Sequence, residues 1–237
     1  MNAFAIKTSV DVHDVDFNGI AKTSAIMQYM QSAAQTQLTE SGMSYERLRS
    51  LNKVFVISRF NMEIRAPLKA YTPLTAKSYV TESRGYTFLR CYQLEADGVA
   101  VARAVSGWAL VDTKTKALVK VNDFDLGLPV LPQNSVTLSK FIIPENTADV
   151  GEWQVRYADT DQNMHMNNTK YPDLYSNFLP LKNKMISKLA INYVSEAPLG
   201  ENLRVHTLQE GNRFYFRTVK SNGQINSEAE IEIADIS

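Results

Sequence analysis

Apolar residues recur about four positions apart between Ser24 and Glu40, and this spacing predicts an amphipathic helix. Its apolar face would carry Ile26, Met27, Met30, Ala33, Ala34 and Leu38. Thr23 or Ser24 is suited to cap the start, and Gly42 to follow the end. A short second helix is expected over residues 44–51.

Strand-like runs occupy most of the remaining chain. The last is the clearest, because apolar Ala229, Ile231 and Ile233 alternate with three glutamates, as in a half-buried strand. Residues 122–150 contain three prolines and little periodicity, which indicates a linker. We expect a second-half helix over about 168–178, and strands over residues 4–12, 55–64, 74–82, 86–94, 99–111, 152–158, 185–195, 203–210, 213–220 and 225–233.

Two motifs occur twice at constant offsets, which indicates an internal duplication. At an offset of 145, the first copy is Asp14, Asp16, Asn18 and Ile20, and the second is Asp159, Asp161, Asn163 and His165. At an offset of 131, Asn61 and Arg65-Ala-Pro-Leu return as Asn192 and Glu196-Ala-Pro-Leu. Only the second half therefore carries the histidine and the glutamate.

Each half thus contains a strand, a long helix and several antiparallel strands. This order predicts an α+β protein in which each half packs a helix on a curled antiparallel sheet. The expected domains are residues 1–121 and 151–237, joined by the linker 122–150. The first half has 14 more residues than the second between its two motifs. The extra length coincides with the longer helix and the short second helix.

Composition and charge argue against several classes of protein. The formal net charge is zero, which argues against a nucleic-acid binder held by a positive field. No run approaches the roughly 20 apolar residues of a membrane helix, and the start resembles neither a signal nor a transit peptide. Cys91 is the single cysteine, so no internal disulfide is possible, and a reducing cytoplasm fits.

The second-half motif is the candidate catalytic centre. If residues 159–165 are extended, Asp161, Asn163 and His165 share one face just before a helix that Asn167 and Asn168 would begin. Histidine titrates near neutral pH, and Glu196 is the candidate general base for a water molecule. Such a site could hydrolyse an activated ester without a covalent intermediate.

Metal and nucleophile alternatives are disfavoured. Asp14, Asp16, Asn18 and Gly19 mimic the start of a calcium loop, but its twelfth position is Ala25. His13 and His206 lack a zinc-binding context, and Cys91 lies in a strand-like run that suggests core. We therefore expect no metal and no cofactor.

Two motifs resemble those of the acyl-acyl carrier protein (acyl-ACP) thioesterases, which end fatty acid synthesis by releasing the chain. The first is Asp161-x-Asn163-x-His165-x-Asn167-Asn168-x-Lys170-Tyr171. The second is Ala102-Arg103-Ala104-x-Ser106-x-Trp108 with Asp112-x-x-Thr115-x-x-Leu118-x-Lys120.

This resemblance, which spans nearly the whole chain, implies a tandem double hotdog fold, an acyl pocket in the first domain and catalysis by Asp161, Asn163, His165 and Glu196. Many relatives have cysteine after the glutamate; Ala197 stands here, which favours a water mechanism. Plant members of the family carry a plastid leader, and in lacking one this sequence is more similar to a bacterial enzyme. The implied partner is acyl carrier protein bearing a fatty acyl thioester.

Two other functions remain open: an acyl-coenzyme A thioesterase, and a non-catalytic acyl-binding hotdog module. The division of roles between Glu196 and His165 is also open. The sequence does not determine the preferred acyl chain. A monomer and a homodimer are both compatible with a tandem pair.

Overall fold

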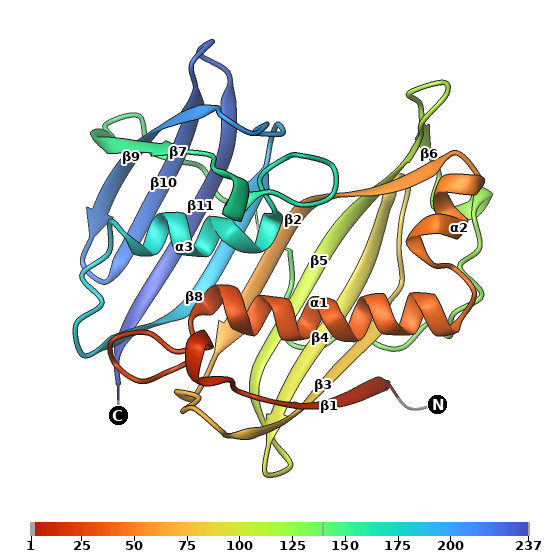
Figure 1. Ribbon diagram of the computed structural model, residues 1–237, viewed down its shortest axis with the longest axis horizontal. Helices are drawn as coiled ribbons and strands as arrows, with labels where there is room; N and C mark the ends of the chain where they lie inside the picture. The colour runs from red at the N-terminus through yellow and green to blue at the C-terminus, as the bar shows by residue number, and fades with distance from the viewer. Residues whose placement is uncertain (1–2, 139, 237) are drawn as a thin grey trace.

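One antiparallel sheet runs through the whole molecule (Figure 1). The computed structural model describes residues 3–138 and 140–236, and in these the sheet has 11 strands. Ten follow the order β1-β3-β4-β5-β2-β8-β11-β10-β9-β7, and β6 pairs with β5. Their bounds are β1 Phe4–Ser9, β2 Lys53–Ile64, β3 Pro73–Val80, β4 Thr87–Ala96, β5 Val99–Asp112, β6 Leu118–Val119, β7 Ala148–Gln154, β8 Lys184–Tyr193, β9 Asn202–Glu210, β10 Arg213–Lys220 and β11 Ile225–Asp235.

The two halves join where β2 pairs with β8, and the register there agrees with the sequence repeat. Phe60 lies opposite Ile191, and these residues are 131 apart, the offset of the second motif. Arg59 pairs with Asn192, and Asn61 pairs with Ala190. A two-fold rotation that replaces each residue by its equivalent 131 positions away converts the first pair into the second. The strand order on one side of this seam is therefore the reverse of that on the other.

In the described part of the chain, three α-helices accompany the sheet: α1 Thr23–Glu40, α2 Tyr45–Ser50 and α3 Tyr171–Ser176. In Figure 1, α1 crosses in front of the first-half strands and α3 in front of β8 and β11. The predicted apolar face of α1 is buried except Leu38, which is half-buried. None of the helices among the described residues is long and apolar enough to cross a lipid bilayer.

The predicted caps of α1 are only partly right. The helix begins at Thr23 with Lys22 at the N-cap position, and no side chain caps it. The Ser24 hydroxyl instead donates a hydrogen bond to Oδ1 of Asp173 in α3 (2.5 Å). Gly42 follows the helix with φ of 80°, a conformation that glycine adopts without strain.

The expected alternation in β11 is confirmed. Ala229, Ile231 and Ile233 are buried in the main core, which spans both halves. The intervening glutamates form ion pairs with neighbouring strands: Glu228 with Arg217 (2.7 Å), Glu230 with Arg213 (3.3 Å) and Glu232 with Lys188 (2.8 Å). A helix packed on an antiparallel sheet, twice over, is thus the architecture that the periodicity predicts.

Part of the predicted linker packs against the sheet. Val136 is buried with Cys91 and Val105 in a small cluster of its own, and Ile143 is also buried. Burial raises the pKa of the Cys91 thiol, so this cysteine is a core residue and not a ready nucleophile. The strand β7 begins at Ala148, within the range expected for the linker.

Candidate active site

The motif of the second half forms a turn, so the prediction of an extended segment is wrong. A 3-10 helix covers Tyr157–Asp159, and the backbone N–H of Asp161 then donates to the carbonyl of His165 (3.0 Å). Oδ1 of Asp161 accepts the N–H of Asn163 (2.8 Å). Aspartate favours turns because its side chain bonds the backbone two residues on, and this competes with strand formation.

His165 and Glu196 are brought together at the end of this turn. Nδ1 of His165 lies 3.4 Å from Oε2 of Glu196, and the two side chains are 34% and 62% exposed. Glu196 lies in the loop after β8, not in the strand. The backbone holds this loop in place, because His165 bridges to Pro198 and the N–H of Met166 donates to the carbonyl of buried Ala197 (2.8 Å).

Asn163 lies between the two halves. Its Oδ1 accepts a hydrogen bond from the hydroxyl of Tyr45 in α2 (3.1 Å). The short helix of the first half therefore contacts the motif of the second. Tyr45 belongs to neither of the repeated motifs nor to the family motifs, and only the packing of α2 against the turn identifies it.

The expected helix over 168–178 is shorter than predicted. A 3-10 turn, Asn168–Lys170, leads into α3. The Asn167 side chain accepts the N–H of Thr169 (3.0 Å), so one of the free donors at this helix start is already bound. Gln31 in α1 donates to the Asn168 side chain (3.0 Å), which ties the long helix to the same turn.

Two buried residues hold the loops that carry the candidate site. Asp159 is buried and accepts the N–H of Arg156 (2.9 Å), so its role is structural. Asn226 is also fully buried. Its amide donates to the carbonyl of Ser195 (2.5 Å) and to the hydroxyl of Tyr171 (3.0 Å).

Asn226 thereby links the loop that carries Glu196 to the start of α3. Burial and, less strongly, the charge of Glu196 raise the pKa of Tyr171 to about 12, so its hydroxyl keeps its proton. A register shift between Thr218 and Val219 leaves Asn226 outside the strand pairing. The alternating pattern of the strand gave no signal of this irregularity.

A cavity of about 320 Å³ opens beside the turn, at the small end of the range for ligand pockets. Asp161 and Asn163 are among its lining residues, whereas His165 and Glu196 are not. Its remaining walls come mainly from α1, α2 and the first-half strands. They include Ala34, Leu38, Leu48, Phe55, Phe88, Arg90, Tyr92 and Trp108.

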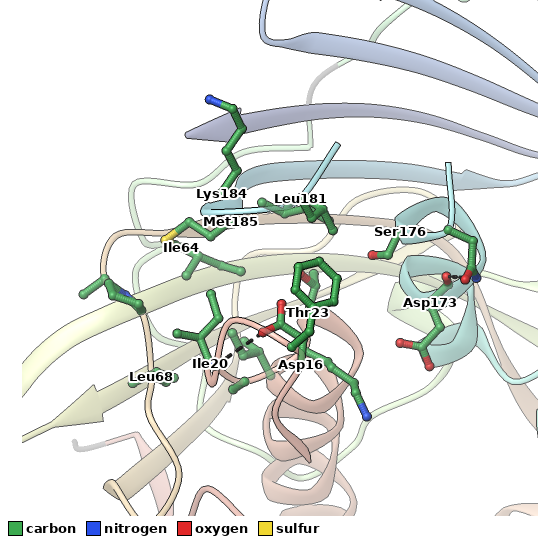
Figure 2. A pocket seen from close by; sticks show the side chains of 18 residues that line it. Asp16, Ile20, Thr23, Ile64, Leu68, Asp173, Ser176, Leu181, Lys184 and Met185 are labelled. Carbon is green, nitrogen blue, oxygen red and sulfur yellow. Dashed lines mark hydrogen bonds between the residues drawn. The ribbon is translucent and has the colours of Figure 1, made fainter. Parts of the chain in front are cut away.

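A second cavity, of about 300 Å³, lies beside the first-half copy of the motif and is lined by residues of both halves (Figure 2). Asp16, Ile20 and Thr23 line it, in the positions of Asp161, His165 and Asn168. The amide of Asn18 donates to the carbonyls of Leu181 (2.8 Å) and of Lys184 (3.2 Å). In this copy the asparagine is bound to backbone, and isoleucine stands at the position of His165.

One group of possible metal ligands lies elsewhere on the described surface. Asp11, His13 and Asp14 bring their side-chain ligand atoms within 4.8 Å of one another. Asp11 and His13 are exposed, and Oδ2 of Asp14 accepts the hydroxyl of Tyr29 (2.6 Å). Exposed acidic groups are common without a metal, so this group supports no metal site.

Comparison with known proteins matches both halves to family models. A model of the acyl-ACP thioesterase N-terminal domain matches residues 1–125, and one of the C-terminal domain matches residues 144–235. No curated protein sequence matches the chain.

Similar solved structures span almost the entire chain. An acyl-ACP thioesterase from Bacteroides thetaiotaomicron is 19% identical, with a TM-score of 0.88 and 97% of each chain covered. The 12:0-ACP thioesterase from Umbellularia californica is 16% identical, with a TM-score of 0.81, covering 98% of this chain and 97% of its own. At this level of identity, the structures show a shared fold.

Proposed function

The chain belongs to the acyl-ACP thioesterase family, it is a thioester hydrolase acting on fatty acyl-ACP, and we propose that this hydrolysis takes place where His165 meets Glu196. The fold is the tandem double hotdog that the motifs implied. The observation that carries the proposal is the 3.4 Å contact between the imidazole and the carboxylate, next to a turn that lines a cavity. In the first half, Ile20 and Arg65 occupy these two positions.

In the proposed reaction, Glu196 accepts a proton from water, and the resulting hydroxide adds to the thioester carbonyl. Collapse of the tetrahedral intermediate breaks the carbon–sulfur bond. The leaving thiolate takes up the proton, and a free fatty acid remains. The exposure of Glu196 gives its carboxylate access to water, and a positioned base contributes roughly 10² to 10⁴ in rate.

His165 and Asn163 would position the water and polarise the thioester. Since Nδ1 of His165 faces Glu196, Nε2 is the nitrogen left to face the substrate. The Tyr45 hydroxyl occupies Oδ1 of Asn163, which leaves its amide N–H groups as donors to a carbonyl oxygen. Asp161 would act indirectly, by holding the turn through the N–H of Asn163.

We assign the acyl chain to the 320 Å³ cavity. Its walls come mostly from the first half, and Asp161 and Asn163 line it from the second. This supports residues 1–121 as the acyl-binding domain, 151–237 as the catalytic domain and 122–150 as the linker. We further propose a cytoplasmic enzyme of fatty acid biosynthesis that acts as a monomer or a homodimer.

The test is release of free fatty acid from a series of acyl-ACP and acyl-coenzyme A thioesters. We expect hydrolysis of acyl-ACP by the wild type and a loss of about 10²-fold or more in H165A and E196Q. Arg65→Gln is the matched control, because Arg65 occupies the position of Glu196 in the other half; it should stay close to wild type.

Each rival function has its own signature in the same assay. Faster turnover of coenzyme A thioesters would favour an acyl-coenzyme A thioesterase. Tight acyl binding without released acid would indicate a non-catalytic module. Wild-type turnover in both H165A and E196Q would refute the proposed site.

A further inference from the structure

The acyl cavity has a buried positive charge in its wall. Arg90 in β4 lines the cavity and is only 7% exposed. Its Nη1 donates to Oε1 of Gln37 (2.6 Å) and to Oγ of Ser78 (2.8 Å). Both partners are neutral, and across the described residues no carboxylate forms an ion pair with Arg90.

Such a charge is costly to bury without a counter-ion. Arginine stays protonated in proteins, although burial lowers the pKa of Arg90. The guanidinium has five N–H donors, and within the described part of the chain only Nη1 is hydrogen-bonded to protein. An acceptor oxygen that entered the cavity would thus meet a charged donor already stripped of bulk water.

Other polar groups surround this charge. Tyr92 and Trp108 line the same cavity, and both contact Oγ of Ser106, from the tyrosine hydroxyl (3.0 Å) and from the indole N–H (2.6 Å). Ser106 lies opposite Arg90 in the pairing of β4 with β5. The hydroxyl of Tyr92 and the indole of Trp108 already have this partner, so it is the N–H groups of Arg90 that a bare hydrocarbon would leave without an acceptor.

Arg90 lies away from the turn that carries Asp161, Asn163 and His165 and leads to Asn168. Gln31 in α1 contacts Asn168 of that turn, and Gln37 in the same helix contacts Arg90. Six residues of α-helix advance about 9 Å along the axis. Arg90 would therefore face the distal part of an acyl chain and not its thioester end.

Resting on the proposed function, we propose that this cavity selects acyl chains that carry an acceptor oxygen in their distal part, a hydroxyl or a carboxylate, which Arg90 binds. The thioester end would remain at His165 and Glu196. Arg90 is thus assigned as a specificity-determining residue, with Gln37 and Ser78 holding its guanidinium in place.

The test compares acyl-ACP substrates of equal length that end in a methyl, a hydroxyl or a carboxylate group. For chains long enough to reach Arg90, we expect kcat/KM to be at least about tenfold higher for one or both oxygenated forms. Arg90→Met should remove that preference. Arg84→Met is the control, because Arg84 is highly exposed and, among the described residues, its side chain pairs only with exposed Glu82 (3.4 Å). This variant should keep the preference.

A wild-type preference for the methyl-terminated chains would overturn the inference, as would an unchanged ratio in a folded R90M. The wild-type comparison needs no variant, so poor folding of R90M does not prevent the test. Hydrolysis of methyl-terminated acyl-ACP without an oxygen preference would leave the proposed function standing and remove this inference alone. Release of no acid from any substrate would contradict both.

Discussion

Replacing Asn226 by alanine tests whether the buried link between the Glu196 loop and α3 positions the candidate site. The change removes hydrogen bonds to Ser195 (2.5 Å), Tyr171 (3.0 Å) and Thr218 (2.9 Å). At about 1 kcal/mol each, these bonds give a loss of about 3 kcal/mol in the free energy of unfolding.

The same change should lower activity. A displacement of about 1 Å in a catalytic group can reduce the rate by 10², so we expect N226A to lose about 10- to 100-fold in kcat with a smaller change in KM. Unfolding in urea gives the stability, and release of fatty acid from acyl-ACP gives the rate. The rate is measured under conditions in which the variant is folded, as its unfolding curve shows.

Leu203→Ala is the matched control. Leu203 is fully buried in β9 of the same half, and such a truncation costs about 2–5 kcal/mol. It should match N226A in stability and keep a kcat close to that of the wild type. Equal loss of kcat in both variants would refute the positioning role and reduce Asn226 to a structural residue.

Three further predictions concern the turn and a surface carboxylate. Met164 has φ of 60°, so M164G should raise the free energy of unfolding by about 0.5–1 kcal/mol, visible as a small rise in Tm. Y45F removes the donor to Asn163 and should lower kcat severalfold with unchanged stability in urea. The hydrogen bond from Lys53 lowers the pKa of Asp112; this stabilisation is present above the unfolded value of about 3.9 and is lost as pH falls through the lower folded value. The difference in unfolding free energy between wild type and D112N should thus shrink below about pH 4.

Repetition in the sequence predicted much of the fold. The offset of 131 between Asn61 and Asn192 reappears as the two-fold register of β2 against β8. Strand alternation at Ala229, Ile231 and Ile233 was also sufficient, because one face of that strand is buried. These patterns are local or repeat at a fixed offset, so they can be read without knowing what packs where.

The sequence patterns predicted the candidate site only in part. The residue types at Asp161, Asn163, His165 and Glu196 suggested chemistry, but the strand geometry expected for the first three was wrong. Short side-chain hydrogen bonds to the backbone favour a turn there, and an alternating pattern of polar residues looks the same in either conformation.

The chain sequence determined the duplication, the absence of the histidine and the glutamate from the first half, and the residues that resemble the family motif. Only the tertiary structure brought Tyr45 to Asn163, Asn226 to the loop of Glu196 and Arg90 into the wall of the 320 Å³ cavity. These contacts join residues from 31 to 118 positions apart. They depend on how two halves pack across one sheet, and periodicity along the chain carries no record of that packing.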